Sequence, residues 1–128
     1  MVFPNKSTPH AVRSSSTLTA ANVAGTVFSI DEHNYLAIQV VYTKGDETSM
    51  QLRIESSIDG GVTYAQQVAE SASAGVITVS LAERTFTVTG NYWVVITPIK
   101  GDLIRISARA TAGTPTGTLA LQAITGWA

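Results

Sequence analysis

The chain has 128 residues and no cysteine, so we expect one domain with a core of its own and exclude disulfides, thiolate metal sites and cysteine nucleophiles. Asp, Glu, Lys and Arg make up 13% of the residues, against about 25% in a typical soluble domain. Such a charge-poor surface is typical of the centre of a protein interface, although a neutral Thr-rich β-surface would have the same composition. A net charge of -1 without a Lys/Arg cluster argues against a sequence-independent nucleic-acid binder.

Residues 1–20 predict an extended N-terminal arm, because Pro4, Pro9 and the run of hydroxyl residues at 14–17 show little alternation and few large apolar groups. The arm could lie over a neighbouring subunit or pack along its own domain. The first residues lack the apolar core of a signal peptide, and no run approaches the ~20 apolar residues of a membrane span, so we expect neither processing nor a membrane. Residues 21–128 then form the single domain.

Period-2 alternation begins after Asn34 and predicts two strands, over 36–43 and 50–55. Lys44-Gly45-Asp46 lies between them and predicts a hairpin turn, since glycine adopts the backbone conformations that tight turns need. The same tripeptide recurs at 100–102, before a strand over 104–109, and predicts a second simple hairpin loop.

The rest of the domain also has strand patterns separated by turn residues. A helix over 63–72 is the alternative to a strand over 62–68, because Tyr64, Val68 and Ala72 lie four residues apart. Ser71 to Gly75 predicts a loop, as do residues 112–117. Further strands are expected at 76–81, 85–89, 92–97 and 118–124, with a weaker one at 26–30. About eight or nine strands at this spacing predict an all-β fold, an antiparallel β-sandwich of jelly-roll or Ig-like type.

The most distinctive local motif has Ser57, Asp59, Gly61, Thr63 and Tyr64 at fixed spacing. It resembles the Asp box of sialidase-like propellers, with tyrosine in place of tryptophan, and the resemblance implies a structural turn outside any active site. Asp59 is suited to accept hydrogen bonds from its own loop. One such box is far too few for a propeller. Calcium or glycan contact is the lesser alternative for this turn.

Catalytic groups do not assemble in any recognisable pattern. His10 and His33 lie in the arm and an early loop, and Asp31-Glu32-His33 is better explained as a solvated loop than as a metal site. No nucleophile elbow, phosphate-binding loop or dinucleotide fingerprint is present in the sequence. We therefore expect a protein without catalytic residues, cofactor or metal.

Arginines and aromatic residues offer the remaining alternatives. Arg53, Arg105 and Arg109 occupy outward strand positions, where they could bind an acidic partner or pair across strands with Glu55. Adjacent aromatic residues at 92 and 93 must face opposite sides of their strand, one toward the core and one outward. The tryptophan at position 127 is expected to pack on its own sandwich or on a neighbour.

Four segments together resemble small β-sandwich structural proteins of tailed bacteriophages: 35–48, 57–61, 104–108 and 113–119. The resemblance implies a homo-oligomeric virion protein, with a trimer as one alternative, assembled in the host cytoplasm. It is most simply a capsid decoration protein that binds the major capsid protein. A portal, neck or tail component is one alternative, and a carbohydrate-binding module using Tyr64, Tyr92 or Trp93 is another. The expected protein contacts are Pro4, His10, Trp127 and the loops around Lys44 and Gly113.

Overall fold

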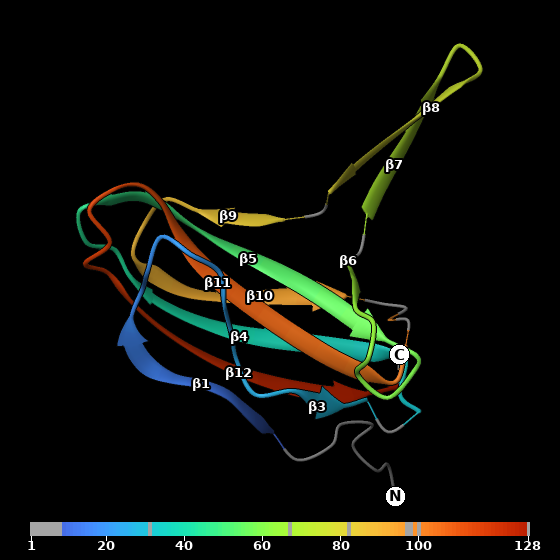
Figure 1. The fold of residues 1–128 in the computed structure, drawn as a ribbon, viewed down its shortest axis with the longest axis horizontal. Coiled ribbons are helices and arrows are strands. Elements are labelled where there is room, and N and C mark those ends of the chain that lie inside the picture. The colour runs from blue at the N-terminus through green and yellow to red at the C-terminus, as the bar shows by residue number, and fades with distance from the viewer. Residues whose placement is uncertain are drawn as a thin grey trace, which may run out of the picture.

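The computed structural model describes residues 9–30, 32–66, 68–81, 83–96, 99 and 101–127. Within these residues every regular element is a β-strand (Figure 1). The strands are β1 (His10–Thr17), β2 (Val23–Ala24), β3 (Phe28–Ser29), β4 (Tyr35–Thr43), β5 (Glu47–Ser57), β6 (Ala65–Gln66), β7 (Val68–Ser73), β8 (Val76–Leu81), β9 (Arg84–Phe86), β10 (Gly90–Ile96), β11 (Leu103–Gly113) and β12 (Thr118–Gly126).

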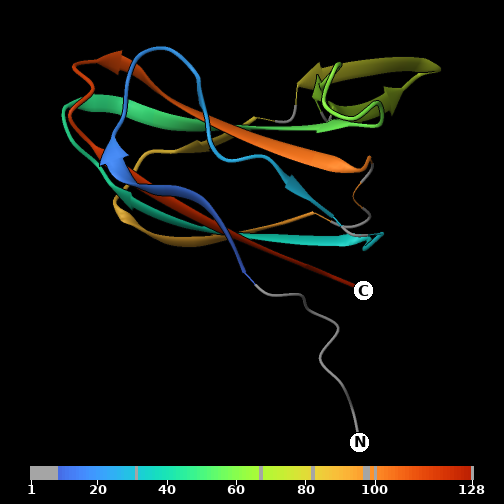
Figure 2. The ribbon, with the colours of Figure 1, turned by 60° about the horizontal axis from the view of Figure 1, so that its bottom comes forward.

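Two antiparallel sheets lie face to face (Figure 2). Sheet A has the order β1-β12-β4-β10, and sheet B has the order β2-β11-β5-β6, with β3 also on β11 and β9 also on β5. β7 and β8 form a separate hairpin that projects beyond the two layers (Figure 1). The predicted all-β antiparallel sandwich is thus confirmed, with more strands than expected because several have only two or three residues.

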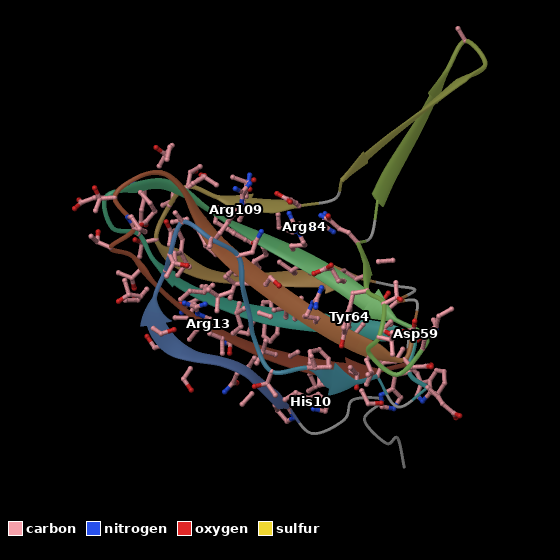
Figure 3. All side chains as sticks on the ribbon, viewed as in Figure 1. His10, Arg13, Asp59, Tyr64, Arg84 and Arg109 are labelled. Carbon is pink, nitrogen blue, oxygen red and sulfur yellow. The ribbon has the colours of Figure 1, made fainter. Side chains whose placement is uncertain are left out.

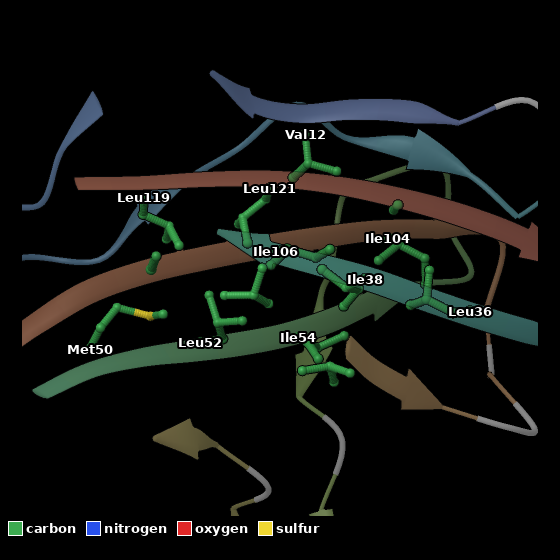
Figure 4. Close-up of a cluster of buried hydrophobic side chains, with 14 of the residues drawn as sticks. Val12, Leu36, Ile38, Met50, Leu52, Ile54, Ile104, Ile106, Leu119 and Leu121 are labelled. Atoms are coloured by element: carbon green, nitrogen blue, oxygen red, sulfur yellow. The ribbon is translucent and has the colours of Figure 1, made fainter. Parts of the chain in front are cut away.

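The core lies between the inner faces of the two sheets (Figure 4). β4 contributes alternate residues from Leu36 to Tyr42, each at most 1% exposed, and β5 contributes Met50, Leu52 and Ile54. Fully burying a side chain of this size stabilises the fold by roughly 1.5–3 kcal/mol. The alternation that predicted these two strands therefore also places their apolar residues against one another.

The connection between β4 and β5 differs from the predicted hairpin. β4 pairs with β10 and β12 in sheet A, whereas β5 pairs with β11, β6 and β9 in sheet B. The Lys44-Gly45-Asp46 turn thus carries the chain from one layer to the other. β10 and β11, the strands on either side of the second Lys-Gly-Asp segment, also belong to different sheets, and residues 114–117 carry the chain between sheets from β11 to β12. Both hairpin predictions were wrong, because strand patterns show which residues face the core but not which sheet a strand joins.

The segment predicted as an N-terminal arm includes an edge strand of the sandwich. β1 pairs antiparallel with β12, from His10 opposite Ala123 to Thr17 opposite Thr118, with two irregularities in register. Val12 and Leu18 are each 2% exposed, so this segment contributes to the core of its own domain. Of the two arrangements considered for the arm, residues 10–18 adopt the intramolecular one. The predicted contact residue Pro4 lies outside the described residues.

Two smaller expectations also differ from the structure. The segment from 71 to 75, predicted as a loop, belongs mostly to the β7–β8 hairpin, whose turn lies at Ala74 and Gly75 with positive φ angles. The alternative helix over 63–72 does not form in the described part of that segment, which contains β6 and β7. The predicted strand over 62–68 is reduced to β6 and the start of β7, because residues 61–63 belong to a turn.

Candidate interaction surface

The outer face of sheet B is covered by charged and polar side chains that bind one another. Arg105 lies opposite Glu55 and donates to both carboxylate oxygens at 3.1 Å, which confirms the predicted cross-strand pair. Arg53 forms an ion pair with Glu83 at 3.1 Å. Strands β5 and β11, which carry these residues, are the long central pair of the sheet.

Further contacts extend this polar network along the same face. Arg109 donates to Gln51 Oε1 at 2.7 Å, and Ser49 hydrogen-bonds Thr111 through their hydroxyl groups. The guanidinium carbon of Arg105 lies over the Tyr64 ring, 4.0 Å from its centroid. Because these groups have intramolecular partners, the outer face of sheet B offers few unpaired charges to a ligand or partner.

The outer face of sheet A has a different composition. Residues opposite one another in an antiparallel pair share a face, so the strand register defines rows that cross this sheet. The rows are Trp93-Gln39-Gln122, Val95-Ala37-Ile124 and Asn91-Val41-Ala120, running from β10 through β4 to β12.

Exposed apolar side chains are concentrated in these rows. Trp93 is 64% exposed, Val95 49% and Val41 39%. Single exposed apolar residues are ordinary on a protein surface, but a contiguous group marks a binding surface. The predicted opposition of residues 92 and 93 is confirmed, since Tyr92 packs on the core and stacks on Phe86 with the ring centroids 4.9 Å apart.

The face is also hollowed in places. A hollow of about 420 Å³ is lined by Tyr35, Ala37, Trp93, Val95 and Ile124. A second, of about 300 Å³, lies between β1 and the centre of the sheet and includes Gln39 and Val41 among its lining residues. The surface can therefore receive projecting side chains of a partner.

Arg13 is the one charged residue among the described face positions of sheet A (Figure 3). Its guanidinium donates to the backbone carbonyls of Leu119 at 3.2 Å, Ser16 at 3.4 Å and Thr17 at 3.2 Å, which fastens the irregular part of β1 to β12. Burial lowers the pKa of Arg13. Because the Arg13 guanidinium is hydrogen-bonded to backbone carbonyls of its own sheet, binding at this face would depend on shape and apolar area rather than on ion pairs.

A buried acid, Glu47, lies at the end of the sandwich where β4 passes into β5. It is 0% exposed, and its carboxylate accepts four hydrogen bonds. Tyr42 Oη donates to Oε2 at 2.6 Å, as does the Gly45 N–H at 2.7 Å. The N–H groups of Thr116 and Gly117 donate to Oε1 at 3.1 and 2.7 Å. Glu47 therefore joins the two inter-sheet loops at this corner.

Electrostatics at this corner also indicate a structural role. Burial alone would raise the pKa of the Glu47 carboxyl, but the hydrogen bonds from Tyr42, Gly45 and Gly117 outweigh it and hold the pKa at about 2. Burial, and then the contact with Glu47, raises the pKa of the Tyr42 phenol. A carboxylate held ionised with every acceptor direction in use is a poor proton donor or acceptor for a substrate.

Two of the predicted contact residues lie near this corner. Lys44 is exposed, its N–H donates to Thr89 Oγ1 at 2.9 Å, and its Nζ lies 3.3 Å from the Gly45 carbonyl. Gly113 has a φ of 72°, and a Cβ at this position would lie 2.5 Å from the Asp46 carbonyl oxygen. Glycine at 113 is thus required by the close approach of the two loops, irrespective of any partner.

The motif resembling an Asp box forms a closed turn after β5. The Ser57 hydroxyl donates to Asp59 Oδ1 at 2.7 Å and accepts the Gly61 N–H at 3.0 Å, and the Thr63 N–H donates to Asp59 Oδ1 at 2.9 Å. These hydrogen bonds, that from Thr63 foremost, lower the pKa of Asp59. Tyr64 lies beside the turn, at the same end of the molecule as Asp59 (Figure 3). The carboxylate thus binds its own loop.

The remaining predicted contact residues lie apart from the corner. His10 is half-buried and stacks on Phe28, with ring centroids 4.9 Å apart. Trp127 is 52% exposed and packs edge-on against His33 at 5.4 Å, while His33 Nδ1 lies 2.9 Å from Thr125 Oγ1. The predicted contacts thus do not form one surface. Sequence reasoning missed Val41 and Val95, although their outward positions in alternating strands were a usable signal.

The described residues contain no group of three or more His, Asp or Glu side chains placed to hold a metal ion. Among the same residues, no helix is long and apolar enough to cross a membrane.

Fold and surface together define an antiparallel β-sandwich with one polar, internally paired sheet face and one charge-poor, partly apolar sheet face. No family model and no curated protein matches the sequence. Among solved structures, the chain is similar to the SPBc2 prophage-derived protein YomS, with a TM-score of 0.58 and 13% identity. The match covers 98% of this chain and 96% of YomS. At this identity the likeness establishes a shared fold over nearly the whole chain.

Proposed function

We propose that this chain is a non-enzymatic structural protein of a bacteriophage particle that works by binding other proteins through the outer face of sheet A. The observation that carries the proposal is the contrast between the two sheet faces. On sheet B, Arg53 and Arg105 form ion pairs and Arg109 donates to a glutamine. On sheet A, Trp93, Val95 and Val41 remain exposed in a nearly uncharged surface. A face of this composition is suited to a largely dry protein contact.

The phage assignment is supported by the fold shared with YomS, a prophage-derived protein. It is also supported by the resemblance of four sequence segments to small β-sandwich proteins of tailed bacteriophages. Within a particle, the most economical role is that of a capsid decoration protein bound to the major capsid protein. A portal, neck or tail position makes similar demands on the surface. Many copies on a lattice gain avidity, so one modest face per subunit is sufficient.

The test is co-sedimentation of the purified chain with head and tail fractions of the phage that encodes it. Val41→Lys places a charge in the centre of the sheet A face, and Ile58→Lys is the matched control, since Ile58 is 81% exposed in the turn after β5. We expect the wild type and Ile58→Lys to sediment with heads, and Val41→Lys to lose at least about tenfold in affinity, because burying an unpaired charge costs more than 1.4 kcal/mol.

Several outcomes discriminate between the roles. Binding to tails alone would replace the decoration role by a tail role and keep the virion assignment. If the chain binds neither fraction, or if Val41→Lys binds as well as the wild type, the proposed use of this face is refuted. Because the face is nearly neutral, the affinity should change little between low and high salt.

A second function, carbohydrate binding, is favoured by one observation. Trp93 is 64% exposed between polar neighbours, since Gln39 lies opposite it and Gln122 lies next in the same row. Tyr64 and Tyr92 do not extend this platform, because they contact Arg105 and Phe86. A glycan array decides this alternative: a sugar bound by the wild type and lost in Trp93→Ala would support it, and an array without binding would reject it.

A further inference from the structure

Free strand edges tend to pair with other strands, and this sandwich protects its edges unequally. In sheet A the β1 edge is covered, because β1 has irregular register and the Thr26 N–H donates to the Val12 carbonyl at 2.8 Å. In sheet B the outermost strands β2, β3, β6 and β9 have two or three residues each. Irregularity, cover and short length are the usual ways in which proteins prevent edge-to-edge association.

β10 has none of these protections. All seven residues from Gly90 to Ile96 pair with β4, and on the other side of β10 no strand of the described chain is paired. The strand contains no proline and no charged residue. Its outward side chains include Trp93, 64% exposed, and Val95, 49% exposed. A regular, apolar and uncharged edge of this length is a template for a further strand.

The space beside this edge is open. A groove of about 520 Å³ is lined by residues 83–88 on one side and by Tyr92, Trp93 and Val94 on the other. The backbone of β10 therefore borders a groove in which an added strand could reach its free N–H and C=O groups.

We propose that β10 pairs with β10 of a second copy of this chain, antiparallel and about a two-fold axis at Trp93. The two sheets A then form one continuous eight-stranded sheet. Trp93 lies opposite Trp93 of the partner subunit, and Asn91 lies opposite Val95 of the partner subunit. The inference rests on the proposed function and deepens it by naming the partner that covers this edge.

Self-pairing fits β10 better than pairing with an unrelated strand. With the axis at the central residue, all seven residues of each strand find a partner, and no residue is left over at either end. A two-fold contact brings each residue near its own symmetry mate, so a charge at the centre would oppose itself. β10 has no charge, and at its centre it has an aromatic residue of the kind that forms favourable cross-strand pairs.

Cysteine cross-linking tests the register directly, because the natural chain has no cysteine. Opposed residues in an antiparallel pair have Cα atoms about 4.5–5.5 Å apart, within disulfide range. Trp93→Cys should therefore oxidise to a linked dimer. Asn91→Cys alone and Val95→Cys alone should not, since each is then ~13 Å from its own mate, whereas an equimolar mixture of the two should give the linked heterodimer. Both proteins in the mixture retain Trp93, so their cross-link tests the register even if Trp93→Cys weakens the dimer.

Light scattering of the cysteine-free chain gives an independent readout. The wild type should show twice the 13.5 kDa of one chain, and Trp93→Lys should be monomeric, because two like charges would face each other at the axis. Val41→Lys, on β4 within the sheet, is the control and should remain dimeric. Monomeric wild-type protein at about 100 μM, well above the Kd of a specific dimer, or a cross-link in Asn91→Cys alone, would overturn the proposal. A wild-type monomer that still binds phage heads would overturn this inference and leave the proposed function standing, whereas a Val41→Lys dimer that binds heads as well as the wild type would refute the proposed function alone.

Discussion

Glu47→Gln tests the inference that a buried carboxylate holds the two inter-sheet loops together. The ionised carboxylate accepts hydrogen bonds from Tyr42, Gly45, Thr116 and Gly117, two at each oxygen. A glutamine presents one oxygen and one NH2 group, so two of the four donors would face another donor. An unsatisfied buried donor costs about 1–3 kcal/mol, and we expect Glu47→Gln to lower the free energy of unfolding by about 3 kcal/mol at neutral pH.

The lowered pKa of Glu47 points to an effect of similar size, because it reflects the same hydrogen bonds. Its folded value of about 2 lies below the ordinary 4.5, so ionisation of this group favours the folded state. At 1.36 kcal/mol for each pH unit, this difference corresponds to roughly 3 kcal/mol. Because the folded pKa is the lower one, this stability is fully present above pH 4.5 and is lost as the pH falls toward 2.

Urea denaturation followed by tryptophan fluorescence measures both effects. The stability gap between wild type and Glu47→Gln should be widest at neutral pH and shrink below about pH 4.5, as the Glu47 carboxyl of the unfolded wild type becomes protonated while that of the folded state remains ionised. Asp46→Asn is the matched control: it makes the same chemical change at the adjacent, exposed position and should alter stability by less than about 0.5 kcal/mol. A Glu47→Gln protein as stable as the wild type, or a gap independent of pH, would refute the reasoning.

Three further predictions concern the corner, the turn and the edge strand. Gly117→Ala should cost at least about 2 kcal/mol in urea denaturation, because its Cβ would contact the Glu47 carboxylate and lie 2.7 Å from the Thr43 carbonyl oxygen. Asp59→Ala should speed hydrogen exchange at the Thr63 amide, measured by NMR, since that N–H loses its acceptor. Leu18→Ala should destabilise by about 2–5 kcal/mol, because Leu18 is 2% exposed; a value near zero would show that this segment does not pack on the core.

Alternation in the sequence was sufficient to predict the long strands and their inward residues. It placed alternate residues from Leu36 and from Met50 in the core, and it put residues 92 and 93 on opposite faces of their strand. It could not assign strands to sheets, because a turn such as Lys44-Gly45-Asp46 is compatible with a hairpin and with a passage between layers. The deciding contact joins Glu47 to Gly117, 70 residues away, and no local pattern encodes it.

The candidate surface was harder to predict than the fold. Loop position and exposure suggested Lys44 and Gly113, yet the structure shows glycine at 113 to be required by loop packing. The sheet A face depends on the order of its strands, and β4 lies between β10 and β12 although it precedes both in the chain. Outward residues of three strands distant in sequence can be recognised as one surface only once the strand order is known.

The strand order of sheet A also bears on synthesis of the protein. β4 lies between β10 and β12, and about 75 residues separate the end of β4 from the start of β12. At roughly 5–20 residues per second, a ribosome needs about 4–15 s to make that stretch. Throughout this interval the nascent chain holds a long apolar strand without its complete set of neighbours. β4, which is buried at the centre of the finished sheet, therefore exposes apolar side chains to solvent until β12 has been made.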